Sequence, residues 1–234
     1  MVTSIVVGGT RGIGSVIASN LIERGDDVYT VSRRTSSSKN HVSCDISSDC
    51  SKLTNSFSKV DYLIFAHRYR GDSWNETFEV TLRGVQNVIQ AISGKLKSDS
   101  SVVIISSNAS QFIVSEQPAH YHASRAALET LMKYYAVTYG KSSKVRFNCI
   151  LPSSLIKPEN LDFFSKNKKI KKLIEDITPL GRMGDANDIA NIVEFLCSSK
   201  SSFLTGNCLM VDGGLSLVGQ ESIAREMIGL NHEK

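Results

Sequence analysis

The stretch Val6-Val7-Gly8-Gly9-Thr10-Arg11-Gly12-Ile13-Gly14 lies near the start of a chain of 234 residues. Its glycines have the spacing Gly-x-x-x-Gly-x-Gly and stand between an apolar β-branched run and a helical pattern over residues 13–24. Gly8 allows a tight turn out of a strand, and Gly12 and Gly14 let a helix N-terminus come close to a diphosphate. The stretch therefore predicts a dinucleotide-binding turn between a strand and a helix.

Apolar β-branched runs alternate with helical patterns along the rest of the chain. The expected strands cover residues 4–7, 28–31, 62–65, 102–105 and 145–150, and the expected helices cover residues 13–24, 78–92 and 123–139. Continuous apolar runs are typical of parallel strands that are buried on both faces. We therefore expect one α/β domain over residues 1–234, a single-domain Rossmann-type doubly wound parallel sheet with helices on both faces.

Composition argues against several other classes of protein. The hydrophobic content of 41% is enough for a packed core, and a net charge of +4 does not indicate a nucleic-acid partner. No apolar run reaches the roughly 20 residues that span a bilayer, and the first residues enter a strand without a secretory signal. The five cysteines lack metal-ligand spacing. We expect a reduced, cytoplasmic protein without metal or structural disulfides.

The second expected strand ends in Val31-Ser32-Arg33-Arg34. An acidic residue at this place would accept hydrogen bonds from the 2′-hydroxyl of an adenine ribose, whereas an arginine suits a 2′-phosphate. Arg11, inside the glycine turn, is a second candidate for the same phosphate. These residues predict NADP(H) rather than NAD, and the alternative is that both arginines are solvated surface residues.

Further motifs follow the glycine turn in a fixed order. Tyr121-His122-Ala123-Ser124-Arg125 places a phenol and a cation one helical turn apart, and Thr178-Pro179-Leu180-Gly181-Arg182 and Val211-Asp212-Gly213-Gly214 come later. Together these motifs resemble the short-chain dehydrogenase/reductase family over nearly the whole chain. Because that family moves a hydride between a nicotinamide and an alcohol or carbonyl carbon, the resemblance implies an oxidoreductase acting on a ketone, 3-oxoacyl-like or other.

The resemblance also implies roles for individual residues. Tyr121 matches the proton-transferring tyrosine, Ser107 matches the serine that orients the substrate oxygen, and Arg125 stands where the family has lysine. Ser106 is the alternative serine, because the spacing to Tyr121 is one residue longer than usual. The expected cofactor-binding residues are Gly8, Thr10, Arg11, Gly12, Ile13, Gly14, Arg33, Asp45, Ile46, Ala66, Tyr121, Arg125 and Pro152.

Three departures from the family pattern keep other functions open. Besides Arg125, the segment Phe65-Ala66-His67-Arg68 replaces Asn-Asn-Ala-Gly, and Thr81 replaces an asparagine that supports a proton relay. Arginine keeps the positive charge but does not exchange a proton near neutral pH. One alternative is an NADP-binding regulatory or catalytically decayed protein. Another is a halohydrin dehalogenase-like enzyme with a Ser-Tyr-Arg triad.

Residues 152–178 are expected to form a substrate loop or lid. Ile170, Leu173, Ile174 and Ile177 have helical spacing, and lysines crowd residues 166–172. These lysines either form a solvated face or attract an acidic or carrier-bound small-molecule substrate. His67, His120 and His122 are candidates for the pocket wall, although packing roles are expected more often than ligand roles. The resemblance, with the apolar positions of residues 126–139, favours a homodimer or homotetramer.

Overall fold

The computed structural model describes residues 1–230. Seven parallel strands form one sheet in the order β3-β2-β1-β4-β5-β6-β9, which confirms the predicted doubly wound Rossmann-type fold. β1 pairs with both β2 and β4, so the strand order reverses beside it. This reversal matters for function because ligands of such sheets bind where the order changes, at the carboxyl ends of the strands.

The central strands are largely buried, as the apolar runs indicate, whereas β3 and β9 at the two edges of the sheet are only partly buried. The strands of the sheet are β1 (Thr3–Val7), β2 (Asp27–Ser32), β3 (His41–Ser43), β4 (Val60–Phe65), β5 (Leu96–Ile105), β6 (Arg146–Pro152) and β9 (Cys208–Val211). A separate two-stranded sheet joins β7 (Leu155–Ile156) to β8 (Gly184–Asp185). This small sheet ties the segment after β6 to the beginning of α8.

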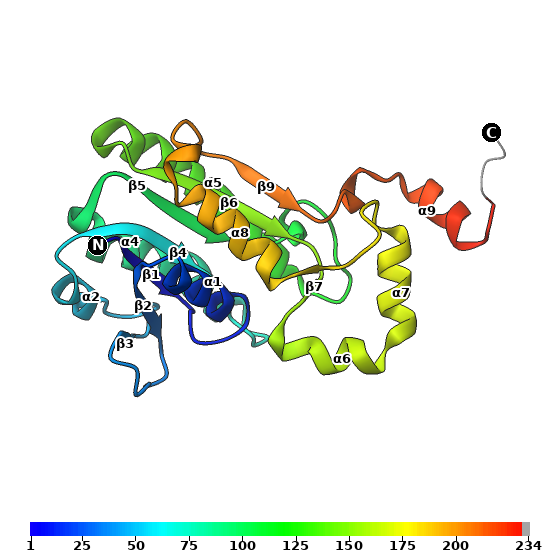
Figure 1. Ribbon diagram of the computed structural model, residues 1–234, viewed down its shortest axis with the longest axis horizontal. Helices are drawn as coiled ribbons and strands as arrows, with labels where there is room; N and C mark the ends of the chain where they lie inside the picture. The colour runs from blue at the N-terminus through cyan, green and yellow to red at the C-terminus, as the bar shows by residue number, and fades with distance from the viewer. Residues whose placement is uncertain (231–234) are drawn as a thin grey trace.

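Helices cover both faces of the sheet (Figure 1). They are α1 (Gly12–Glu23), α2 (Ser51–Ser56), α3 (Trp74–Phe78), α4 (Gly84–Ile92), α5 (Ala119–Ser143), α6 (Leu161–Lys166), α7 (Lys168–Ile177), α8 (Ala186–Leu196) and α9 (Gln220–Met227). One hydrophobic cluster joins the sheet to α1 and α8, and the other joins it to α2, α4 and α5. None of the helices within residues 1–230 is long and apolar enough to cross a membrane.

Several element bounds differ from the sequence-based expectation. The helix expected at residues 78–92 begins at Trp74 and contains a π-helical turn at Glu79–Arg83 before α4. α5 extends four residues beyond each end of the expected segment 123–139. The lid holds two helices, α6 and α7, which meet at Asn167. The spacing of apolar residues does not reveal such a break, because a single polar residue between two helices does not interrupt that spacing.

Candidate active site

A cavity of about 410 Å³ opens at the carboxyl ends of the central strands. Its walls come from the ends of β1, β2, β4, β5 and β6, from α5, and from the loop between β6 and α6. The cavity therefore lies where the strand order reverses, the usual ligand site of an open parallel sheet.

The glycine turn between β1 and α1 is shaped by positive φ angles, 81° at Gly8 and 61° at Gly12. A Cβ on Gly8 would lie 2.7 Å from the backbone of His67, and a Cβ on Gly14 would collide with the carbonyl of Gly8. The cap residue Arg11 makes no side-chain hydrogen bond to α1. The first N–H groups of the helix are thus not capped by that residue and suit an anion. The turn fits a diphosphate group.

Gly14 serves the turn by packing rather than by lining the cavity. Among the described residues, the cavity wall includes Gly8, Gly12 and the other expected neighbours Thr10, Ile13, Ala66 and Pro152. Ile46 also reaches the wall, although its side chain is 6% exposed and packs against Gly84 of α4. Except for Gly14, the predicted residues therefore converge on one cavity from seven separate segments.

Arginines gather at the cofactor end of the cavity, beyond the carboxyl end of β2. Arg11, Arg33 and Arg34 all line it with exposed side chains. Within residues 1–230, none of the three forms an ion pair. The nearby Asp45 carboxylate accepts hydrogen bonds from the backbone and the hydroxyl of Ser47, at 3.1 and 2.7 Å. This end of the cavity is therefore positive.

Ser107, Tyr121 and Arg125 meet at the other end of the cavity, which we call the reaction end. Ser107 follows β5, and its hydroxyl accepts a hydrogen bond from the backbone of Ala109 at 3.2 Å. Tyr121 lies in the first turn of α5, and the Arg125 guanidinium carbon stands 5.0 Å from the centre of its ring. Ser106 instead donates to the Arg125 carbonyl at 3.4 Å. Ser107 is therefore the serine that hydrogen-bonds to the Tyr121 phenol.

The surroundings of Tyr121 favour its ionised form. Burial by itself raises the pKa of the phenol, but the Arg125 charge and a hydrogen bond with Ser107 oppose it most strongly. The net pKa of Tyr121 lies below the usual value of a tyrosine. A lowered phenol pKa suits a group that exchanges a proton near neutral pH.

Arg125 is almost completely enclosed, with 3% of its surface exposed. It donates to the carbonyl of Ile105 at 3.3 Å, while its Nε is buried without a hydrogen-bond partner. Burial lowers the pKa of the guanidinium, and the Tyr121 phenol opposes that shift. An arginine stays protonated in such a place, so Arg125 supplies a fixed positive charge beneath the phenol.

The segment after β4 supplies two more residues to the reaction end. The Arg68 guanidinium carbon lies 4.6 Å from the centre of the Tyr121 ring, and its Nη2 donates to Gln117 at 2.8 Å. His67 Nε2 donates to the carbonyl of Val80 at 3.0 Å. Burial, and next the Arg125 charge, lower the pKa of His67 to about 4. His67 is therefore neutral at physiological pH.

Thr81 and two of the histidines stand behind the wall of the cavity. Thr81 and Val80 both belong to the π-helical turn. Thr81 is only 2% exposed and is not part of the cavity wall, whereas Val80 lines the cavity. His122 accepts from the backbone of Val114 at 2.9 Å and donates to Pro118 at 3.1 Å, which ties the preceding loop to α5. His120 packs beside Trp74. His120 and His122 therefore have packing roles.

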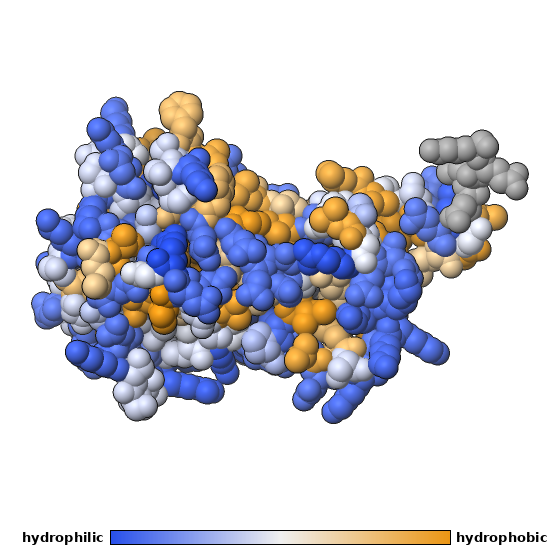
Figure 2. Space-filling model, in the orientation of Figure 1, coloured by the Kyte–Doolittle hydropathy of each residue, from blue (hydrophilic) through white to orange (hydrophobic). Residues whose placement is uncertain are grey.

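The lysines of the lid lie away from the cavity. Lys171 and Lys172 pair with Glu175 and Asp176 one turn further along α7, and no residue of α7 is part of the cavity wall within the described chain. Figure 2 shows the outer side of α7 as mostly hydrophilic. The arrangement fits the solvated-face interpretation of these lysines.

Three charged residues of the cavity wall were not expected from the sequence. They are Arg70, Lys157 and Glu159. The signals available were the Arg68-Tyr69-Arg70 run at the carboxyl end of a central strand and the charges immediately after Pro152. Neither pattern shows by itself that the two segments face each other across the cavity.

Comparisons with known proteins agree with this architecture. The family model described as enoyl-(acyl carrier protein) reductase matches residues 7–216. A tropinone reductase homolog from Arabidopsis thaliana is 26% identical over 93% of this chain and 91% of its own length. An uncharacterized oxidoreductase from Schizosaccharomyces pombe is 30% identical over 97% and 95%.

A solved structure shows the same fold. The ligand-free aldohexose dehydrogenase of Thermoplasma acidophilum superposes with a TM-score of 0.82, at 25% identity, over 94% of this chain and 95% of that protein. The fold and cavity define a dinucleotide-binding α/β protein. The chain belongs to the short-chain dehydrogenase/reductase family of oxidoreductases, a family that uses a nicotinamide cofactor and acts on small molecules.

Proposed function

We propose that this protein is an NADP(H)-dependent reductase that interconverts a carbonyl and an alcohol. The observation that carries the proposal is the Tyr121 phenol, with its lowered pKa, at one end of a cavity whose other end is a glycine cradle. A proton-exchanging group and a dinucleotide-binding turn facing one cavity are the two parts that hydride transfer with protonation requires.

The residues at the reaction end divide the chemistry between them. When bound, the reduced nicotinamide supplies a hydride to the carbonyl carbon. Tyr121 donates its phenolic proton to the substrate oxygen, and the Ser107 hydroxyl donates a hydrogen bond to the same oxygen. Arg125 stabilises the phenolate that remains. Because Arg125 does not release its own proton, the phenolate regains one from water.

The choice of NADP(H) is supported by charge at the cofactor end. Arg11 and Arg33 line the cavity beyond β2 without ion-pair partners among the described residues. The ribose 2′-phosphate would be the negatively charged partner of these two side chains. A guanidinium binds a phosphate through parallel hydrogen bonds.

The substrate is proposed to be an anionic ketone or its alcohol. Arg68 stands over the Tyr121 ring, and its one side-chain hydrogen bond among the described residues is to the neutral amide of Gln117. A carboxylate on the substrate would satisfy this charge while its carbonyl reaches Tyr121. A free keto acid meets that requirement directly, whereas a carrier-bound thioester has no free carboxylate and would need another negatively charged group.

The proposed assembly is a homodimer or homotetramer. On the outer side of α5, Tyr134 is 62% exposed and Val137 is 72% exposed. Large apolar side chains grouped on one helix face commonly belong to an interface between subunits.

One experiment separates this proposal from its alternatives. The full chain is titrated with NADPH and NADH, and is then supplied with a panel of acidic and neutral ketones while NADPH oxidation is followed. Binding with oxidation supports the reductase. Binding without turnover of any ketone indicates a regulatory or decayed protein, and absence of binding with opening of epoxides by halide indicates a dehalogenase.

A further inference from the structure

Glu159 reaches across the cavity to the N-terminus of α1. Its carboxyl carbon lies 3.0 Å, and its Oε2 2.9 Å, from the point where a Cβ on Gly12 would stand. Gly12 is the first residue of this helix of 12 residues. A carboxylate therefore stands beside the first residue of α1, close to a helix N-terminus, where negative charge is favoured.

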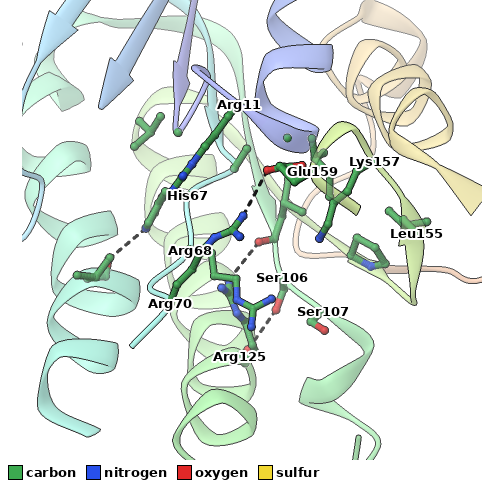
Figure 3. Close-up of a pocket in the computed structure, with 18 of the residues that line it drawn as sticks. Arg11, His67, Arg68, Arg70, Ser106, Ser107, Arg125, Leu155, Lys157 and Glu159 are labelled. Atoms are coloured by element: carbon green, nitrogen blue, oxygen red, sulfur yellow. Dashed lines mark hydrogen bonds and ion pairs between the residues drawn. The ribbon is translucent and has the colours of Figure 1, made fainter. Parts of the chain in front are cut away.

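Two cations accompany this carboxylate. Arg70 Nη2 forms an ion pair with Glu159 Oε1 at 3.3 Å (Figure 3). Lys157 lines the same cavity from the same loop. Burial lowers the pKa of the Lys157 ammonium, the Glu159 charge opposes that shift, and Arg68 adds to it. Positive charge thus reaches one carboxylate from three segments, namely the loop after β4, the N-terminus of α1 and the lid.

The loop that carries Glu159 is built as a unit. Asn160 accepts a hydrogen bond from the backbone of Lys157 at 2.8 Å and donates to the carbonyl of Leu155 at 2.9 Å. These bonds hold the turn together without using Glu159. The carboxylate is therefore not needed to form its own loop, and its neighbours lie on other segments.

We propose that Arg70, Lys157 and the N-terminus of α1 form the diphosphate clamp of this protein, and that Glu159 is an internal anion that fills the clamp until a dinucleotide displaces it. The inference rests on the proposed dinucleotide-binding function. A diphosphate and the Glu159 carboxylate need the same place and the same cations, so the two exclude each other.

The sharpest variant is Glu159→Gln, which keeps the size of the side chain and removes its charge. We expect both NADP and NAD to bind about three- to tenfold more tightly, by the same factor, since they share the diphosphate and lose the same competing anion. Adenosine 2′-monophosphate, which has no diphosphate, should bind equally to the wild type and the variant. Affinities are measured by isothermal titration calorimetry on the full chain.

A matched control and a second variant make the test decisive. Asp162→Asn removes the same charge from the first turn of α6, away from the cavity wall, and should leave both affinities unchanged. Arg70→Gln should weaken both dinucleotides, and should do so equally in the Glu159→Gln background. If the effect of Arg70→Gln vanishes in that background, Arg70 only holds Glu159 and the clamp is wrong.

The remaining outcomes distinguish this inference from the proposed function. If wild type and Glu159→Gln bind the dinucleotides with equal affinity, or the variant binds them more weakly, the internal-anion proposal is overturned while the reductase stands. If neither protein binds NADP or NAD, the proposed function and the clamp fail together.

Discussion

The two ends of the cavity are assembled in different ways. Most of the cofactor end comes from two short contiguous stretches, residues 8–13 and 31–34, which adjacent parallel strands bring together, and residues 44–46 follow the next strand. The reaction end comes from distant segments, namely residues 67–68, 105–107 and 121–125. The departures from the family pattern at Arg68 and Arg125 lie at the second end. A local motif can therefore keep its residues while a site assembled by long-range packing takes substitutions.

The largest effect is expected at the reaction end, from Tyr121→Phe. Loss of the phenolic hydroxyl should reduce kcat by about 10²- to 10⁴-fold, because proton transfer to the substrate oxygen is lost. The affinity for NADP should change little, since the ring still packs. Steady-state kinetics and calorimetry measure the two effects. Retained turnover would show that Tyr121 is not the proton donor and would end the functional division between the two ends.

Arg125 tests whether charge or proton exchange matters at that end. Arg125→Met should lower kcat by about 10²-fold and move the alkaline limb of the reduction pH profile upward, since the phenol pKa rises without its neighbouring cation. Arg125→Lys should preserve or raise activity. If the wild type turns over no ketone and Arg125→Lys creates reductase activity, the site is a decayed one.

His67 lies between the two ends of the cavity. Its backbone is close to Gly8, and the charge of Arg125 lowers the pKa of its side chain. With a folded-state pKa of about 4 against an ordinary value of 6.5, the unfolded chain binds more protons between these values. Stability should therefore fall as pH decreases from about 6.5 to 4, by about 1–3 kcal/mol.

His67→Gln keeps an N–H donor for Val80 and removes the titration. Urea unfolding at pH 4.5, 5.5 and 7 should show a shallower pH dependence in this variant than in the wild type. Identical pH slopes in the two proteins would mean that His67 does not carry the effect.

At the cofactor end, Arg33→Ala should weaken NADP binding by several-fold to about tenfold and leave NAD binding nearly unchanged. The physical reason is the loss of a charge-assisted hydrogen bond to the 2′-phosphate. Calorimetric titration with each dinucleotide gives the ratio. Equal losses for NADP and NAD would contradict the assignment of this end to the 2′-phosphate.

The smallest effects compare Arg68, at the reaction end, with Lys172, on the lid and outside the cavity wall. Arg68→Gln should raise the KM for an acidic ketone a few-fold, less so at high salt, and leave the KM of a neutral ketone unchanged. Lys172→Gln should change neither, because Lys172 pairs with Asp176 on its own helix. If Lys172→Gln raised the KM for the acidic ketone more than Arg68→Gln did, the lid lysines rather than Arg68 would attract the substrate.

The fold was predictable because its signals are local and repeated. Apolar runs such as Tyr62–Phe65 and Val102–Ile105 indicated strands buried on both faces, and the structure pairs them in parallel register. The bounds of the helices were harder to predict from the sequence. The π-helical turn at Glu79–Arg83 and the break at Asn167 depend on how each helix packs, which a periodic pattern does not record.

The sheet, the glycine turn and the chemical groups at Tyr121 and Arg125 could be predicted from the sequence alone, because each depends on spacing within one or two adjacent elements. Only the tertiary structure decided which serine faces the phenol, where Arg68 points, and that Glu159 lies over Gly12. These contacts join residues far apart in the chain. Their geometry is set by packing across the sheet edge, and no local pattern encodes it.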